Sequence, residues 1–336
     1  MKEKTDVPCA GTKKQNKKVD IIVPCFNESG TVDLFYDRTS EAVETIDGYE
    51  FSFIFIDDGS TDDTLDRIRN LVRVNQQKND SPGTGSIRYI SFSRNFGKEA
   101  AMYAGLRASD SDYALIMDAD LQHPPQMIGS MISRLEETGA DSCAARRVSR
   151  KGEPKIRSMF ARLFYKVMNR FSDIEIADGV VDFRLMSRRM VRAIVNMPEN
   201  QRFSKGIFAW VGFDTCWIEF ENVERIAGES KWSVWSLTKY AIDGFIDFAV
   251  SPLKFVGVFG SITAAGSAVY MIVEIVKTLI LGKDVPGYAS TICLILFFGG
   301  LIIAILSVIG EYIGRMYLET KGRPIYVEKE SNIDEN

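Results

Sequence analysis

A short apolar run that ends in two carboxylates constrains this chain more than any other feature. Residues 113–117 read Tyr-Ala-Leu-Ile-Met, and Asp118 and Asp120 follow directly. Such a run is typical of a buried central strand, which here carries charge to its own carboxyl end. Because alternate residues of an extended chain face the same side, both carboxylates and Gln122 can face one hard cation. We therefore predict Mg2+ or Mn2+ at Asp118, Asp120 and Gln122, completed by water and substrate phosphates.

A solvated acidic turn is the alternative, since Asp-x-Asp occurs in many loops. Three further units of strand, polar turn and helix favour a ligand site. Their strands are expected at 19–23, 51–56 and 87–92, and their polar turns at 24–30, 57–64 and 93–98. The repeat predicts an α/β fold, a mostly parallel sheet with helices on both faces. Ligands bind at the carboxyl ends of strands in such sheets, so we expect the turns to form one nucleotide crevice.

Composition excludes several classes of function. The chain has 336 residues, a formal net charge of -4 and a pI near 5.4, so there is no general basic footprint and we expect no nucleic-acid partner. Five scattered cysteines without a C-x-x-C spacing argue against structural zinc and against a disulfide framework. The single histidine, His123, stands beside two prolines, which favours a structural role over that of a base.

The chain divides by composition into a polar part and an apolar end. Tryptophans and apolar residues at helical spacing after residue 231 favour a helix in the membrane interface, with a surface helix packed on the soluble part as the alternative. Two long apolar stretches follow, at about 255–281 and 286–310, and the lysines and arginines that flank their outer ends place both termini in the cytosol. The expected parts are a disordered basic leader at 1–18, a catalytic domain at 19–230, an interfacial amphipathic helix at 231–252, a transmembrane hairpin at 253–312 and a cytosolic tail at 313–336.

Seven segments in this order resemble a known family. They are Val-Pro-Cys-Phe-Asn-Glu at 23–28, Asp-Asp-Gly-Ser-Thr-Asp-Asp-Thr at 57–64, Ser-Arg-Asn-Phe-Gly-Lys at 93–98, Asp-Ala-Asp-Leu-Gln-His-Pro-Pro at 118–125, Asp-Phe-Arg-Leu at 182–185, Gly-Glu-Ser-Lys-Trp at 228–232 and the stretch at 310–324. The chain resembles family 2 inverting glycosyltransferases of the dolichol-phosphate mannose synthase type, and within them the polyprenyl-phosphate glycosyltransferases with two C-terminal spans. The resemblance implies a GT-A-like, Rossmann-like fold.

The resemblance also implies roles for single residues. Nucleotide binding falls to Pro24, Phe26, Glu28, Asp57, Asp58, Lys98 and Asp118. Catalysis falls to Asp120, Asp182, Arg202 and Lys231. Phosphate and acceptor binding falls to Arg147, Arg157, Arg225, Ser230 and Lys231. The last three precede the expected interfacial helix, which would hold them at the depth of a lipid headgroup.

The implied reaction is metal-dependent transfer of a sugar, glucose from UDP-glucose, to a polyprenyl phosphate at the cytosolic face of the inner membrane. The enzyme is expected to be a homo-oligomer, with a tetramer as the family-level expectation. Another sugar, such as mannose or a modified aminosugar, is the first alternative. A non-catalytic membrane scaffold that binds nucleotide is the second, although a scaffold needs no metal site.

Overall fold

A computed structural model describes residues 16–78, 85–147, 179–220 and 287–333, with single helical positions between 259 and 280. The described residues form a central sheet of eight strands in the order β7-β5-β6-β4-β1-β2-β3-β8. β1 (Lys17–Cys25), β2 (Tyr49–Asp57), β3 (Ile87–Phe92) and β4 (Tyr113–Ile116) are mutually parallel. This confirms the four strands expected from the apolar runs and their parallel arrangement.

The rest of the sheet is mixed. β6 (Val180–Ser187) runs antiparallel to both β4 and β5 (Ser142–Arg147), and β7 (Thr215–Phe220) runs parallel to β5. At the opposite edge β8 (Glu328–Ser331) pairs antiparallel with β3. The sheet is therefore mostly parallel at its centre, with one antiparallel strand inserted beside β4.

Helices cover both faces of the sheet because the central strands are apolar on both sides. On β1, Ile21 packs in the core that lies against α1 (Val32–Glu44), α2 (Thr64–Lys78) and α4 (Met127–Thr138). Its neighbour Ile22 packs in the opposite core, against α3 (Lys98–Ala108), α6 (Arg188–Val195) and α7 (Ser204–Trp210). Successive strand residues point to opposite faces, so a strand between two helical layers needs a continuous apolar run.

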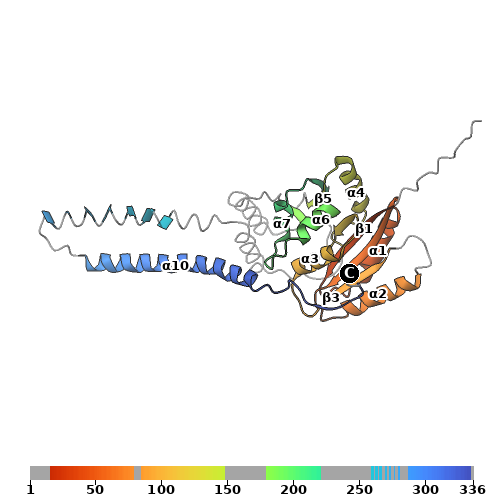
Figure 1. Ribbon diagram of the computed structural model, residues 1–336, viewed down its shortest axis with the longest axis horizontal. Helices are drawn as coiled ribbons and strands as arrows, with labels where there is room; N and C mark the ends of the chain where they lie inside the picture. Colours follow the sequence, from red (N-terminus) through yellow and green to blue (C-terminus); the bar gives the residue numbers. More distant parts are fainter. Residues whose placement is uncertain are drawn as a thin grey trace, which may run out of the picture.

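A long apolar helix leaves this α/β core. α10 (Tyr288–Thr320) extends as a single rod away from the sheet (Figure 1). Its segment Phe297–Thr320 has a mean hydropathy of 1.9 and is the one helix among the described residues that is long and apolar enough to cross a membrane. Most residues of the first expected span, and the whole expected interfacial helix at 231–252, lie outside the described residues. The two-helix hairpin therefore stays a prediction.

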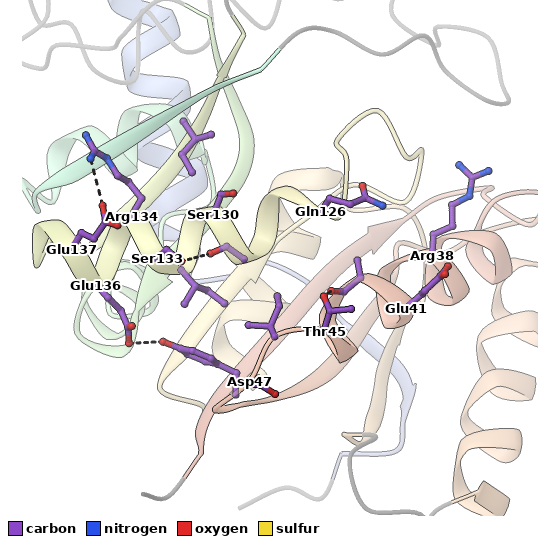
Figure 2. Close-up of a pocket in the computed structure, with 16 residues that line it drawn as sticks. Arg38, Glu41, Thr45, Asp47, Gln126, Ser130, Ser133, Arg134, Glu136 and Glu137 are labelled. Atoms are coloured by element: carbon purple, nitrogen blue, oxygen red, sulfur yellow. Dashed lines mark hydrogen bonds and ion pairs between the residues drawn. The ribbon is translucent and has the colours of Figure 1, made fainter.

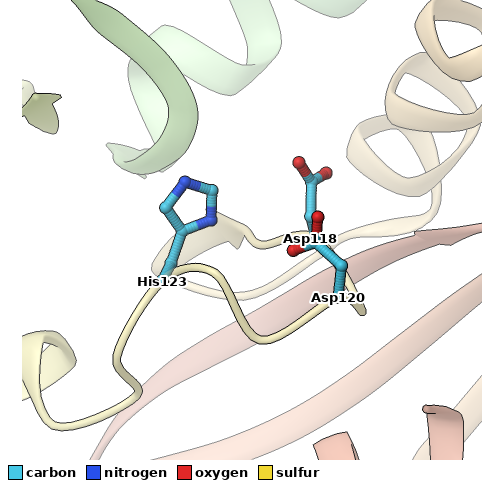
Figure 3. A group of neighbouring side chains, drawn as sticks. All are labelled: Asp118, Asp120 and His123. Atoms are coloured by element: carbon cyan, nitrogen blue, oxygen red, sulfur yellow. The ribbon is translucent and has the colours of Figure 1, made fainter. Parts of the chain in front are cut away.

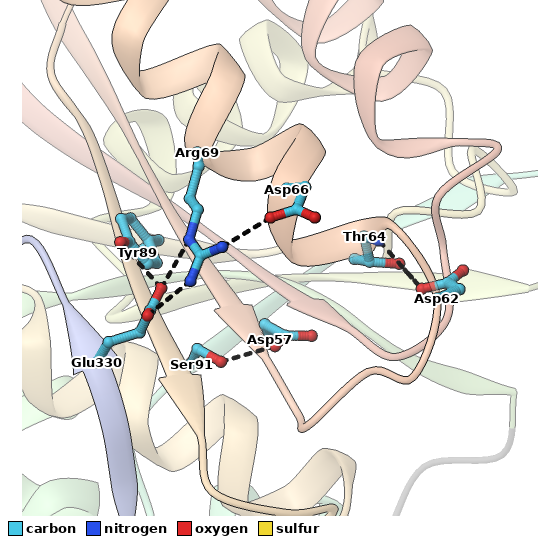
Figure 4. A network of polar contacts seen from close by, with 8 residues as sticks. All are labelled: Asp57, Asp62, Thr64, Asp66, Arg69, Tyr89, Ser91 and Glu330. Atoms are coloured by element: carbon cyan, nitrogen blue, oxygen red, sulfur yellow. Dashed lines mark hydrogen bonds and ion pairs between the residues drawn. The ribbon is translucent and has the colours of Figure 1, made fainter.

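After α10 the chain returns to the sheet as a C-terminal strap, residues 322–332. Tyr326 stacks on Phe92 with ring centroids 4.7 Å apart. Arg69 of α2 donates to both carboxylate oxygens of Glu330 at 2.9 and 2.7 Å, and Tyr89 donates to the same carboxylate (Figure 4). The strap thus ties the far end of the apolar helix to β3, whose carboxyl end leads into one of the polar turns.

Candidate functional site

The first two polar turns are joined by hydrogen bonds. The backbone N–H of Asn27 donates to Ser60 Oγ at 2.9 Å, and that of Thr61 donates to Asn27 Oδ1 at 2.8 Å. The backbone N–H of Glu28 donates to Thr64 Oγ1 at 2.8 Å, at the start of α2. Asn27 has a φ of 53°, a left-handed conformation that asparagine tolerates better than most residues. The two turns therefore form one continuous, hydrogen-bonded rim.

Buried carboxylates hold the second turn against the third. Asp57 accepts the hydroxyl of Ser91 at 2.8 Å (Figure 4). Asp58 accepts the backbone N–H groups of Phe96 at 2.6 Å and of Gly97 at 2.9 Å. Burial raises the pKa of Asp58 to about 6, although both backbone donors oppose that shift. Asp57 thus contacts β3 and its own turn, and Asp58 contacts the third turn. The predicted nucleotide-binding role of both residues stays a prediction.

The fourth turn carries the predicted metal ligands. Asp118 and Asp120 follow β4, and ligand atoms of these two residues and of His123 all lie within 4.8 Å of one another. Figure 3 shows one ring nitrogen of His123 turned toward the two carboxylates. The imidazole is buried, and among the described residues its Nδ1 has no hydrogen-bond partner. Two carboxylates and an imidazole form a donor set that fits Mn2+, or Mg2+ with more water ligands.

His123 also packs as a structural residue, as its position beside two prolines suggested. Its ring stacks on Phe183 at 5.1 Å and meets Phe220 edge-on at 5.5 Å. Burial lowers the pKa of His123, and the carboxylates of Asp118 and Asp120 oppose this. A neutral imidazole with a free lone pair is the form that binds a metal ion. The structure therefore adds His123 to the candidate ligands, a role that the sequence argument did not consider.

The alternation of side chains expected from Asp118 to Gln122 does not continue through this turn. β4 ends at Ile116, and Leu121 has a φ of 56°, so the chain is not extended from Asp120 to Gln122. The backbone N–H of Gln122 donates to Asp120 Oδ1 at 3.1 Å. Because the left-handed residue reverses the alternation, His123 reaches the carboxylates. Gln122 as a ligand stays a prediction that now rests on the family resemblance.

A lysine bridges two strands at the floor of the site. Lys98 Nζ lies 2.7 Å from Asp118 Oδ1 and 2.7 Å from Asp182 Oδ2. Asp182 is there because β6 is antiparallel to β4 with Ile116 opposite Arg184, a register that places residue 182 opposite residue 118. Burial alone would lower the pKa of Lys98, but the two carboxylates raise it above its ordinary value. The structure therefore brings together Asp118, Asp120, Lys98 and Asp182, four of the predicted site residues.

Polar contacts of Glu99 and Arg202 lie next to the Lys98 ion pairs. The partly buried carboxylate of Glu99 accepts both the backbone N–H and the hydroxyl of Ser204. Arg202 stacks over the Tyr103 ring at 4.5 Å and donates to the carbonyl of Met197. Its described contacts are thus with α3 and its own loop, and a catalytic role for Arg202 stays a prediction.

Other predicted residues lie at the rim or beyond the described chain. Glu28 accepts the hydroxyl of Thr31 at 2.8 Å, and Pro24 lies in β1 and Phe26 in the first turn. Arg147 ends β5, where its backbone N–H donates to the carbonyl of Gly179. Arg157, Arg225, Ser230 and Lys231 lie outside the described residues, so the structure does not test their roles.

A groove of about 1040 Å³ lies away from this site, between α1 and α4 (Figure 2). Its lining mixes acids and bases, including Arg38, Glu41 and Arg134. None of Asp118, Asp120, Lys98 or Asp182 lines it. The carboxyl ends of the central strands therefore remain the candidate active site.

The chain matches one protein-family model and several known proteins. The model of "Glycosyl transferase family 2" matches residues 20–195, which contain the four turns and Asp182. The chain is 42% identical over 315 residues to "Putative glycosyltransferase CsbB" of Bacillus subtilis (strain 168), covering 94% of this chain and 92% of the relative. It is 39% identical over 312 residues to "Prophage bactoprenol glucosyl transferase homolog" of Escherichia coli (strain K12), covering 93% and 98%.

A third relative is "Bactoprenol glucosyl transferase" of Shigella phage SfX, 39% identical over 312 residues, with 93% of this chain and 99% of the relative covered. Among solved structures, glucosyl-3-phosphoglycerate synthase from Mycobacterium tuberculosis matches with 16% identity and a TM-score of 0.46 over 68% of this chain and 76% of that one. The family match over half of the chain, and relatives of such identity over nearly the whole of it, lead to one conclusion: the chain belongs to glycosyl transferase family 2.

Proposed function

We propose that this glycosyltransferase moves glucose from UDP-glucose to a polyprenyl phosphate at the cytosolic face of a membrane, with inversion at the anomeric carbon and with Mg2+ or Mn2+. The single observation that carries the proposal is the cluster of Asp118, Asp120 and His123 at the end of a central strand. A hard cation at such a strand end is suited to a diphosphate. Relatives named bactoprenol glucosyl transferase support glucose and a polyprenyl acceptor.

The proposed step is a direct displacement. An oxygen of the lipid phosphate attacks the anomeric carbon, the bond from that carbon to the donor's β-phosphate oxygen breaks, and the nucleoside diphosphate leaves with the bonding electrons. The lipid phosphate is anionic at neutral pH, so no side chain has to remove a proton from it. The protein therefore acts by positioning and by charge, which are large terms in catalysis.

The proposed reaction gives a role to each of several site residues. A divalent cation held by Asp118, Asp120 and His123, with Gln122 as the further predicted ligand, would offset charge on the leaving diphosphate. Lys98, which pairs with Asp118 and Asp182 in this structure, supplies a second positive charge for the diphosphate. Asp182 orients Lys98, and we assign the acceptor phosphate to Arg225, Ser230 and Lys231.

The membrane part of the proposal rests on α10. Large apolar side chains are exposed along it, including Ile295, Phe297 and Ile303, each more than half exposed. An apolar surface of this size on a helix of 33 residues is costly in water and favourable in lipid. We propose that α10 is one arm of a two-helix hairpin, with the catalytic domain and both termini in the cytosol and the assembly a homo-oligomer.

The test is an assay of the purified full-length protein in detergent. Radiolabelled nucleotide sugars are offered singly with undecaprenyl phosphate and Mn2+, and label in the extracted lipid is counted. We expect UDP-glucose to be the efficient donor and a chelator to abolish transfer. If another nucleotide sugar were the efficient donor, the proposed donor sugar would be wrong, and the proposed reaction would stand. Binding of UDP without transfer from any donor would favour the nucleotide-binding scaffold.

A variant pair tests the metal site within the same assay. Asp120→Asn removes one negative ligand without changing side-chain size, and we expect it to lose at least about a hundredfold in kcat because the charge on the leaving diphosphate is no longer offset. The control is Asp37→Asn, the same change at an exposed position of α1. Full activity of Asp120→Asn would remove this residue from the metal site.

A further inference from the structure

Lys98 forms an ion pair with Asp118, one of the carboxylates proposed to bind the cation. Its Nζ is 2.7 Å from Asp118 Oδ1 and 2.8 Å from Oδ2, so the ammonium group sits against both oxygens. The same nitrogen is 2.7 Å from Asp182 Oδ2. Lys98 begins α3, and both carboxylates come from strands, so these contacts join three separate elements.

An ammonium group and a divalent cation compete for one carboxylate. Both are positive, and both would lie within about 3 Å of the same oxygens, where repulsion between them is strong in a partly buried cleft. Asp118 has only 26% of its side chain exposed and Asp182 only 19%, so solvent screens the two carboxylates incompletely. A cation that binds Asp118 therefore weakens the contact of Lys98 with this carboxylate and favours its displacement.

Lys98 has a second partner to which it can remain attached. Asp182 holds Nζ from the β6 side, so the amine can leave Asp118 without losing all its compensating charge. A lysine side chain has a flexible stem and three donors, which allows it to turn toward a new anion nearby. The negative groups that a nucleotide sugar brings to this position are the phosphates of its diphosphate.

We propose that Lys98 is the counter-ion of Asp118 while the cleft holds no substrate, and that it exchanges this carboxylate for the diphosphate of an incoming nucleotide sugar. The inference rests on the proposed function. In the absence of nucleotide, Lys98 on Asp118 keeps the affinity for the cation low. In the absence of the cation, the affinity for the nucleotide is low as well. The two affinities are then coupled by the same factor in either direction.

The experiment measures Mn2+ binding rather than turnover. Purified full-length protein is titrated with Mn2+, and free Mn2+ is followed by its electron paramagnetic resonance signal, with and without UDP. For the wild type we expect UDP to tighten Mn2+ binding about tenfold or more. Lys98→Met should bind Mn2+ about tenfold more tightly than the wild type in the absence of UDP, because the competing charge is gone. In that variant the coupling to UDP should be weaker than in the wild type, and the part that remains comes from the diphosphate as a ligand of the cation.

Three controls separate this effect from others. Lys98→Arg keeps the charge and should bind Mn2+ without UDP as weakly as the wild type. Lys17→Met removes one positive charge from the amino end of β1, where Lys17 pairs with Glu136, and should leave Mn2+ binding unchanged. Thermal unfolding reports whether each variant is folded, and Lys98→Gln replaces Lys98→Met if the latter is not.

Unchanged or weaker Mn2+ binding by folded Lys98→Met without UDP would overturn the inference, while leaving the proposed function in place if the wild type binds Mn2+ with UDP. Equal tightening by Lys17→Met would also overturn it, since the effect would then be one of net charge. A wild type that binds no Mn2+ even with UDP would remove the metal from the proposed function, and this inference with it.

Discussion

Glu319, in the last turn of α10, accepts the backbone N–H groups of Asn200 at 2.8 Å and of Gln201 at 3.1 Å. The end of the apolar helix is thereby attached to the loop that carries Arg202 and leads into α7. With α10 in lipid, as proposed, this contact sets the position of that loop relative to the membrane surface, where the proposed polyprenyl phosphate acceptor would present its charge.

We expect Glu319→Ala to lower kcat/KM for the lipid acceptor about two- to tenfold, a range that allows for the solvent exposure of these hydrogen bonds. UDP affinity should stay unchanged, and Glu319→Gln should restore part of the loss because its amide oxygen still accepts. The control is Glu311→Ala, two turns earlier, where the exposed carboxylate of Glu311 pairs with Arg315 of the same helix and not with the loop. Equal losses in both variants would show that the loop contact has no special role.

The ion pair between Arg69 and Glu330 predicts a pH dependence of the strap. The hydrogen bond from Arg69 lowers the pKa of Glu330 below its ordinary value, so this pair stabilises the fold above the unfolded-state pKa and loses that effect as pH falls through the lowered value. We expect Glu330→Gln to lower the melting temperature at pH 7 and the difference from wild type to vanish in strong acid. A difference that persists after Glu330 is protonated would assign the effect to packing instead.

Two glycines with nearly the same φ provide a matched test of the contact between the second and third polar turns. Gly59 has a φ of 67° and Gly139 a φ of 66°, so alanine is strained by about 1–2 kcal/mol at either position. A Cβ on Gly59 would lie 2.4 Å from the backbone carbon of Arg94, whereas one on Gly139 would meet nothing within 4 Å. Gly59→Ala must therefore also push the second turn away from the third.

We expect Gly139→Ala to reduce only the free energy of unfolding. Gly59→Ala should destabilise the protein further and weaken UDP binding, which calorimetry can measure at a temperature where both variants are folded. Equal UDP affinity of the two variants would show that the contact between these turns does not shape the nucleotide site.

A buried ion pair far from the site predicts a purely structural effect. Asp20 is fully buried in β1, where it pairs with Arg88 at 2.6 Å and accepts the hydroxyl of Ser109 at 2.8 Å. Removing one partner of a buried pair costs about 3 kcal/mol or more when the other charge is left without a close partner, and Arg88 would keep only the exposed carboxylate of Asp110, at 3.6 Å. Asp20→Ala should show this loss in denaturant unfolding, whereas Asp33→Ala, in an exposed pair with Arg67, should change it by less than about 1 kcal/mol. Similar losses in both would contradict the importance of burial.

The sequence by itself determined the four units of strand, turn and helix and the position of Asp118 and Asp120 at a strand end. These follow from local patterns: a continuous apolar run needs cover on both faces, and the polar residues after it begin a turn. The placement of all four turns at one edge followed from parallel pairing. The apolar character of α10 was also evident from composition, since a span depends on a single uninterrupted stretch.

Only the tertiary structure decided what meets these carboxylates. Asp182 lies opposite Asp118 because β6 inserts antiparallel beside β4, and no local period specifies which strand edge a later segment will join. His123 reaches the cluster because Leu121 adopts a left-handed conformation, which the expected extended parity excluded. The strap pairs Glu330 with Arg69 across 261 positions of sequence. Each of these contacts depends on which strand edges and side chains the folded sheet brings close together. That is a property of the assembled sheet, and no single segment of sequence specifies it.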